Sequence, residues 1–214
     1  METFIVRVWL PDRPGALGQV ASRVGAVGGD VVGIDILERE GGQAIDELVI
    51  ELPDRSLIDL LTSEITDVDG VAVEDIRPAQ NVVHDSRLDA LEAAALLVSA
   101  KTRDELVKSL VTRSMDDFSA EWVVALVHDS LDTAKILFGV GDAPAPRWLA
   151  AFTEGTRLSN SHDPAGPNDI AWAHLSQADI SLILGRKGPP FRARERRQIA
   201  VLARVADVRW PEVE

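Results

Sequence analysis

The residue types best suited to holding a ligand lie at residues 11–17, Pro-Asp-Arg-Pro-Gly-Ala-Leu, between an apolar run and an amphipathic segment. Gly15 allows backbone to approach a ligand closely, and the N-terminus of a following helix offers unpaired N–H groups. These donors, together with the helix dipole, suit a carboxylate. Asp12 at the edge of this loop can accept from an ammonium group, and Asp30 can do the same from the other side.

The same loop also has a purely structural interpretation. Asp-x-Pro-Gly forms an ordinary turn, in which Asp12 or a neighbour caps the helix by accepting from its backbone N–H groups. Asp30 is then a solvated residue that follows a glycine stop. The alternatives at this point are a ligand-binding loop and a module whose only role is pairing with another domain.

The elements that position this loop follow from apolar spacing. Residues 4–10 are a near-continuous apolar run and predict a buried strand. From Ala16 the apolar residues fall at helical spacing until Gly28-Gly29, which ends the helix. The remaining predicted elements are strands at 31–37 and 44–52 joined by a turn at 40–43, a helix at 56–65 and a strand at 71–76. This order, βαββαβ, predicts a ferredoxin-like α+β fold.

In this context the run Leu10 to Leu17, followed by a helix, Gly28-Gly29-Asp30 and a strand, resembles an ACT domain over residues 3–78. The resemblance implies a small regulatory module that binds an amino acid, usually across paired domains. In amino-acid-binding members the positions of Asp12 and Asp30 are commonly Asn, so both depart from that pattern here. The ligand-contacting residues that the resemblance implies are Asp12, Arg13, Pro14, Gly15, Ala16, Leu17 and Asp30.

Charge and composition place a domain boundary near residue 80, with residues 81–86 as a linker. Residues 1–80 carry 6 Arg and 16 acidic residues, a net of −10, whereas residues 81–214 carry 16 basic and 19 acidic residues, a net of −3. Apolar spacing in the second part predicts helices at 82–100, from 102 onward, at 147–156 and after Phe191, with strands at 121–127, 133–141, 170–175 and 180–186, and a polar loop at 160–169. This order predicts an α/β domain around an antiparallel sheet.

The end of the chain carries a second resemblance. The strand at 180–186, then Pro190-Phe191, then Glu195 and a helix ending near Ala206, resemble the end of a GAF domain, over roughly residues 85–210. The resemblance implies a module that binds a small molecule or mediates dimerisation. The Asn-Lys…Phe signature of cyclic-nucleotide binders is absent from the sequence, so no ligand is assigned to this domain.

Catalysis and metal binding are not predicted. None of the four histidines (84, 128, 162 and 174) forms a metal-ligand spacing, and the sequence lacks a Gly-x-Ser-x-Gly elbow and a phosphate-binding Gly-Lys-[Ser/Thr] loop. The pairs His162-Asp163 and Asp116-Asp117 are typical of solvated residues. A basic run at 186–197 is interpreted as a solvated helix start, or as a surface that docks an anionic ligand or the acidic first 80 residues.

Composition narrows the remaining classes. The 214 residues hold 22 basic and 35 acidic side chains, a net of −13, which argues against nucleic acid and anionic membranes as partners. With no cysteine, disulfides and thiolate chemistry are excluded. Neither a signal peptide nor a spanning segment is apparent, so a cytoplasmic location is expected.

We therefore expect a non-catalytic, small-molecule-sensing regulatory protein that needs no cofactor. The open edges of a four-stranded sheet predict at least a homodimer. The sequence shows no effector domain, so the output is expected to pass to a protein partner in trans. The alternative is a structural interaction module without a ligand, and an enzyme ranks third.

Overall fold

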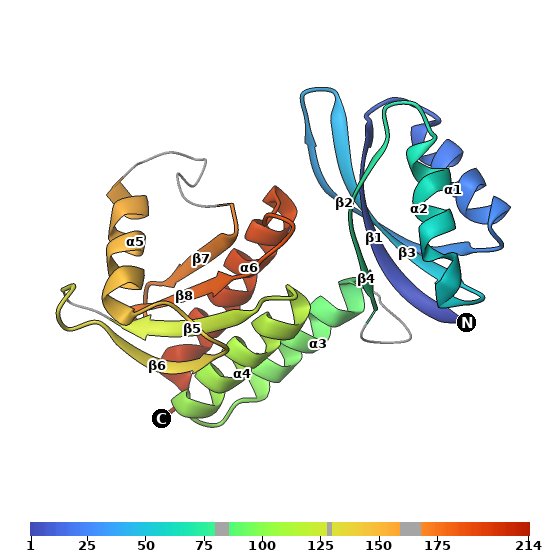
Figure 1. Cartoon of the computed structure of the whole chain (residues 1–214). Helices are drawn as coiled ribbons and strands as arrows, with labels where there is room; N and C mark the ends of the chain where they lie inside the picture. Colours follow the sequence, from blue (N-terminus) through green and yellow to red (C-terminus); the bar gives the residue numbers. More distant parts are fainter. Residues whose placement is uncertain (80–85, 128–129, 159–167) are drawn as a thin grey trace. The chain divides into compact units, whose positions relative to one another are not determined.

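The computed structural model describes residues 1–79, 86–127, 130–158 and 168–214, and within them the chain divides into two units (Figure 1). One unit comprises Met1–Arg87 with Arg192–Arg194, and the other Leu88–Phe191 with Glu195–Glu214. The predicted linker at 81–86 and polar loop at 160–169 fall almost entirely outside the described residues, as do His84, His128 and His162. The boundary near residue 80 stays a prediction.

The first unit has the predicted βαββαβ order. Its described strands form an antiparallel sheet in the order β2-β3-β1-β4. The elements are β1 (Glu2–Pro11), α1 (Ala16–Ala26), β2 (Asp30–Glu40), β3 (Gln43–Leu52), the short 3-10 helix η1 (Arg55–Leu57), α2 (Ile58–Thr66) and β4 (Ala72–Pro78). This is the ferredoxin-like arrangement.

Alternation along β1 explains why the helices cover one face of this sheet. Phe4, Val6, Val8 and Leu10 are buried in a core with α1 and α2, while the residues between them point to the opposite face. Figure 1 shows α1 and α2 lying on the same face of the sheet. The helices supply Ala16, Val20, Val24, Leu61 and Ile65 to that core.

The second unit has an antiparallel sheet whose described strands run in the order β6-β5-β8-β7. Its elements are α3 (Ser86–Ser99), α4 (Arg103–Asp117), β5 (Trp122–Val127), β6 (Lys135–Val140), α5 (Pro146–Leu158), β7 (Ile170–Leu175), β8 (Ile180–Gly185), α6 (Ala193–Arg209) and the 3-10 helix η2 (Trp210–Glu212). The fold class is therefore α+β with an antiparallel sheet in each unit, and the GAF-like identity of this unit stays a prediction.

Both faces of the second sheet are covered. Val123 and Ala125 of β5 pack in one core with α3, α4 and α6, whereas Val124 and Leu126 pack with Leu149 of α5. Figure 1 shows α5 on the opposite side of the sheet from α4. The runs of β5 and β8 are buried without alternation because both of their faces are covered.

Two element starts differ from the prediction for local reasons. β6 begins at Lys135 rather than at 133, because Thr133 closes a turn in which its N–H donates to the Ser130 carbonyl at 3.2 Å. The segment predicted as one helix from Ser56 begins as a 3-10 turn, in which Asp54 accepts from the Ser56 N–H at 2.7 Å. A backbone turn decides the start of β6, and capping by the Asp54 side chain decides the start of η1.

Candidate ligand-binding site

The loop between β1 and α1 is held in place by backbone hydrogen bonds. The Asp12 N–H donates to the Gly42 carbonyl at 2.9 Å, which ties the loop to the β2–β3 turn. The Arg13 N–H donates to the Pro11 carbonyl at 2.8 Å, which turns the chain at the end of β1. The first of these bonds ties the loop to the sheet, and the second shapes its turn.

The N-terminus of α1 is open. Gly15 precedes the helix with φ +88°, a left-handed conformation that favours glycine, and a Cβ at this position would meet nothing within 4 Å. No described side chain caps α1, and its first turn holds no acidic residue. The Ala16 N–H bonds to the Arg13 carbonyl, but within the described residues the N–H groups of Leu17 and Gly18 have no acceptor. Such donors at a helix N-terminus can bind an anion.

A buried acid lies on the same face of the sheet, near this open end. Asp46 of β3 stands opposite Val8 of β1, and Val8 belongs to the core beneath the helices, so the two side chains share that face. Asp46 is only 3% exposed, and its Oδ1 has no hydrogen-bond partner among the described residues. Burial raises the pKa of Asp46; nearby Arg39 lowers it, and the Asp12 carboxylate raises it further.

Asp12, Arg39 and Asp46 together form what we call the loop cluster. Arg39 Nε lies 3.9 Å from Asp12 Oδ1, and both side chains are exposed, so this pair contributes about 0–1 kcal/mol. The N-cap position belongs to Gly15, without a side-chain cap, so the structural alternative in which Asp12 caps α1 is wrong. The loop cluster is acidic, with one cation for two carboxylates, and can accept a positively charged group.

The other predicted loop residues have different surroundings. Arg13 is exposed and its Nη2 lies 3.4 Å from Gln19 Oε1, at the limit of a hydrogen bond. Pro14 is exposed, whereas the Ala16 side chain is buried in the core and Leu17 packs partly against it. Ala16 and Leu17 can therefore contact a ligand mainly through the backbone.

Asp30 does not join this group within one chain. It opens β2 opposite Glu51, while Glu40 at the other end of β2 stands opposite Gln43, beside the loop. At about 3.3 Å per residue, the length of β2 separates Asp30 from the loop by roughly 30 Å. Asp12 and Asp30 could meet at one ligand only if a second copy supplied one of them.

The opposite face of the same sheet carries a charged network that the sequence analysis missed. Arg7 donates from Nε and Nη2 to Glu47 Oε1 at 3.0 and 2.8 Å, and Arg77 reaches the same oxygen at 2.7 Å. Burial of Glu47 would raise its pKa, but Arg77 and Arg7 outweigh that effect and lower the pKa below its ordinary value. Each charge in this network has partners inside the unit, so its role is structural. The sequence did contain a signal for this network, because the apolar run at residues 4–10 includes one charged residue, Arg7.

The sequence also held a signal for Asp46. In β3 the residues at every second position, Ala44, Leu48, Ile50 and Leu52, belong to the core, and Asp46 falls in the same series. A charged residue at an inward position of a strand is unusual and indicates either a partner or a function.

Of the two pairs named in the sequence, Asp116-Asp117 lies within the described residues and His162-Asp163 lies outside them. The expectation that Asp117 is solvated is wrong. Asp117 forms an ion pair with Arg113, whose Nε lies 2.9 Å from Asp117 Oδ1. Burial raises the pKa of Asp117 to about 6; Arg113 opposes this shift, and Asp89 and Asp116 add to it. His174 Nε2 lies 3.8 Å from Asp179 Oδ1. Across the described ranges, no group of three or more His, Asp or Glu side chains could hold a metal ion.

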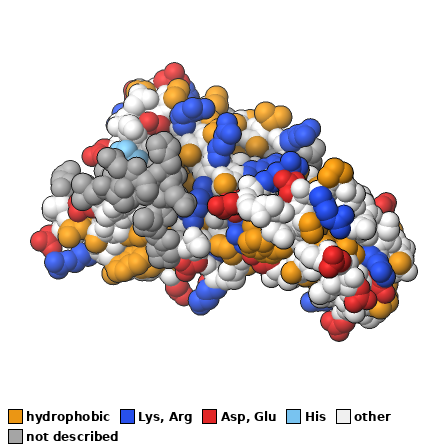
Figure 2. Space-filling model, turned by 90° about the horizontal axis from the view of Figure 1, so that it is seen from above, with side chains coloured by type: hydrophobic (Ala, Val, Ile, Leu, Met, Phe, Trp, Pro, Cys, Tyr) orange, Lys and Arg blue, Asp and Glu red, His pale blue; other side chains and the backbone are white. Residues whose placement is uncertain are grey.

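The basic run at 186–197 is partly structural. Arg186 is 5% exposed and ion-pairs with Glu195 at 2.8 Å, while its guanidinium donates to the carbonyls of Phe118, Pro189 and Pro190. Arg196 donates to the carbonyls of Phe191 and Ile170. These two cations hold loops of the second unit together, so the expectation of a solvated run is wrong for Arg186. On the face shown in Figure 2, acidic, basic and apolar side chains are interspersed.

None of the helices in the described part of the chain is both long and apolar enough to cross a membrane. No protein-family model matches the sequence, and no curated protein matches it.

Several solved structures are similar to part of the chain. An uncharacterized protein from Thermotoga maritima is 24% identical with a TM-score of 0.30, over 37% of this chain and 98% of that one. A formyltetrahydrofolate deformylase from Pseudomonas putida is 16% identical with a TM-score of 0.30, over 42% of this chain and 36% of that one. The ACT domain of a GTP pyrophosphokinase from Chlorobium tepidum is 17% identical with a TM-score of 0.28, over 40% of this chain and 96% of that one. Scores at this level carry no argument about ligand or partner.

Proposed function

We propose that the chain is a cytoplasmic regulatory protein that senses an amino acid at the loop between β1 and α1 and transmits the bound state without catalysing a reaction. One observation carries the proposal: an open helix N-terminus, suited to a carboxylate, lies near Asp46, a buried acid whose Oδ1 is unpartnered. An amino acid supplies both complementary charges.

Each half of the ligand has a separate set of groups. The carboxylate would accept from the N–H groups at the start of α1, which the helix dipole makes favourable for an anion. The ammonium group would approach the loop cluster, where Asp12 is exposed and Asp46 is the deeper acceptor. A buried carboxylate without a partner costs free energy, and a ligand ammonium removes part of that cost.

The experiment is a thermal-shift screen against the twenty amino acids, followed by calorimetric titration of any amino acid that binds. A ligand at a hundred times its Kd stabilises the native state by about 2.7 kcal/mol. The deaminated and decarboxylated analogues of that amino acid should each bind at least about tenfold more weakly, because each lacks one charge.

Matched variants locate the site. Asp46→Asn and Asp12→Asn should weaken binding, whereas Asp59→Asn, an exposed acid on α2, should leave it unchanged. Equal binding of the deaminated analogue, or an unchanged affinity in Asp46→Asn, would remove the loop cluster from the site.

The proposal includes a homodimer formed along β2. This strand is an edge of the sheet and exposes Val32, Ile34 and Ile36 at 52%, 47% and 40%. Exposed apolar edge strands favour pairing with another chain. Antiparallel pairing of β2 with a second copy would bring Asp30 of that copy to the end where this chain's Asp12 lies, which reconciles the two predicted residues.

Sedimentation velocity tests the pairing. The unmodified chain should sediment as a dimer at micromolar concentration, and Ile34→Lys should shift it toward monomer. Val208→Lys, which changes an exposed apolar side chain on α6, should not. Two results together would favour the alternative of an interaction module without a ligand: Ile34→Lys disrupts the dimer, and none of the twenty amino acids raises the melting temperature.

A further inference from the structure

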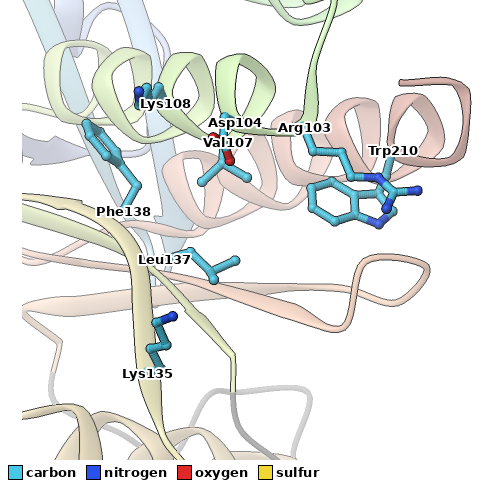
Figure 3. Close-up of a pocket in the computed structure, with 8 residues that line it drawn as sticks. All are labelled: Arg103, Asp104, Val107, Lys108, Lys135, Leu137, Phe138 and Trp210. Carbon is cyan, nitrogen blue, oxygen red and sulfur yellow. The ribbon is translucent and has the colours of Figure 1, made fainter. Parts of the chain in front are cut away.

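A separate hollow of about 290 Å³ lies in the second unit, between α4, β6 and η2. Figure 3 shows Asp104 and Val107 extending from α4 on one side, Leu137 opposite them, and Trp210 at one end beneath Arg103. Small-molecule pockets begin at about 300 Å³, so the hollow suits a ligand of modest size.

The apolar lining depends on an irregularity in the edge strand. Ala125 stands opposite Phe138 and Leu126 opposite Ile136, so Leu137 has no partner in β5 and forms a β-bulge. Leu137 is 43% exposed and lines the hollow with Phe138, Val107 and Trp210. Bulges redirect side chains and are frequent beside functional sites, because the extra residue leaves the regular alternation.

The hollow is also positively charged in an acidic protein. Two of the four lysines of the chain, Lys108 and Lys135, line it together with Arg103, against Asp104 as the acidic lining residue. Within the described residues, no carboxylate lies within ion-pair distance of any of these three cations. Arg103 instead stacks over the Trp210 ring at 4.9 Å, and Lys108 lies 6.0 Å from the centroid of Phe138.

The N-terminus of α4 contributes little to this positive charge. Thr102 Oγ1 accepts from the Glu105 N–H, and the Arg103 N–H donates to the Glu214 carbonyl, so side chains and backbone already occupy these donors. An anion in the hollow would therefore be held by the side-chain cations, above an apolar surface that includes an indole ring.

We propose that this hollow binds a small organic anion with a planar apolar body, such as an aromatic carboxylate. The apolar body packs against Leu137 and Trp210, and the lining cations Arg103, Lys108 and Lys135 attract the carboxylate. The site is independent of the amino-acid site in the first unit, and either can exist without the other.

The probe is 2-naphthoate, titrated into the full chain and followed through the indole N–H resonance of Trp210 in ¹H–¹⁵N NMR spectra, assigned with Trp210→Phe. We expect a saturable shift of that resonance. 2-Naphthamide, which has the same rings without the charge, and acetate, which has the charge without the rings, should each bind at least about tenfold more weakly.

The double variant Lys108→Gln/Lys135→Gln should weaken 2-naphthoate binding about tenfold or more. Its matched control is Lys101→Gln/Lys187→Gln, which removes the same net charge from the other two lysines and should leave the affinity unchanged. Leu137→Asn should weaken binding by loss of the apolar contact. An unshifted Trp210 resonance, equal binding of the amide, or an equal loss in both double variants would overturn the proposal.

Discussion

The N-termini of α1 and α4 solve the same problem in opposite ways. α4 begins after Thr102, whose Oγ1 accepts from the Glu105 N–H at 3.1 Å, while Glu105 Oε2 accepts from the Lys101 N–H at 2.8 Å. α1 begins after Gly15, with no described side-chain cap and no acid in its first turn. The N-terminus of α4 uses its donors for stability, and the N-terminus of α1 keeps them available for a ligand.

This difference makes the loop before α1 the better candidate for binding a ligand, because no side-chain cap uses the N–H groups at the start of α1. Capping is worth about 1 kcal/mol, so an uncapped helix of eleven residues gives up stability that a single substitution could recover. The following variants test that comparison.

Gly15→Val should have the largest effect, a loss of about 2 kcal/mol in the free energy of unfolding. A β-branched side chain at φ +88° is strained even though a Cβ there would meet no neighbour. Urea denaturation measures the loss, and Gly18→Val within α1 is the control that adds the same side chain at ordinary helical backbone. Equal losses in the two variants would show that the conformation of Gly15 is not required.

Asp117→Asn at the last residue of α4 should stabilise the protein by about 1–2 kcal/mol at pH 8. Because the native pKa of about 6 lies above the ordinary aspartate value of 3.8, the native state binds the proton more tightly than the unfolded state does. The stability that this group contributes is complete below pH 3.8 and is lost as the pH rises through 6.

The advantage of Asp117→Asn should therefore disappear between pH 6 and pH 4, and unfolding curves at pH 4, 6 and 8 follow it. A variant less stable than the parent at pH 8 would mean that the ion pair with Arg113 outweighs the burial of the carboxyl.

Thr102→Ala should destabilise the protein by about 1 kcal/mol, through the Glu105 N–H that loses its acceptor. Thr102→Ser keeps the hydroxyl and should restore most of the difference. Both changes should leave amino-acid binding unaltered, because α4 belongs to the other unit. Calorimetric melting measures the stability, and a coupled loss of binding would contradict the separation of roles.

Gly18→Glu should have the smallest effect on stability, a gain of about 0.5–1 kcal/mol from helix propensity and the dipole. A Cβ at Gly18 would meet nothing within 4 Å, so the side chain can be accommodated. The same change places a negative charge where the ligand carboxylate is proposed to bind, and it should weaken amino-acid binding. Gly18→Ala gains the propensity without the charge and should bind normally; a parallel loss of binding in Gly18→Ala would point to helix rigidity as the cause.

The local elements were predictable because local rules determine them. Apolar spacing and glycine stops located each strand and helix of the first unit to within a few residues, and the Thr102 start of α4 followed from its acidic first turn. The β2–β3 turn at Gly41-Gly42 was predicted for the same reason, since both residues adopt positive φ. The loop at residues 11–17 stood out because a proline and a glycine separate two strongly patterned segments.

What the sequence determined by itself was the order of elements, the acidity of the first 80 residues and the presence of a loop with proline and glycine before α1. The tertiary structure decided which side chains surround that loop: strand register places Asp46 near it and sends Asp30 to the far end of β2. Tertiary structure also gave Arg7 and Arg186 their partners, from residues 40 and 9 positions away. The physical reason is that helix and turn formation depend on neighbours in the chain, whereas burial and charge pairing depend on which strand lies next to which.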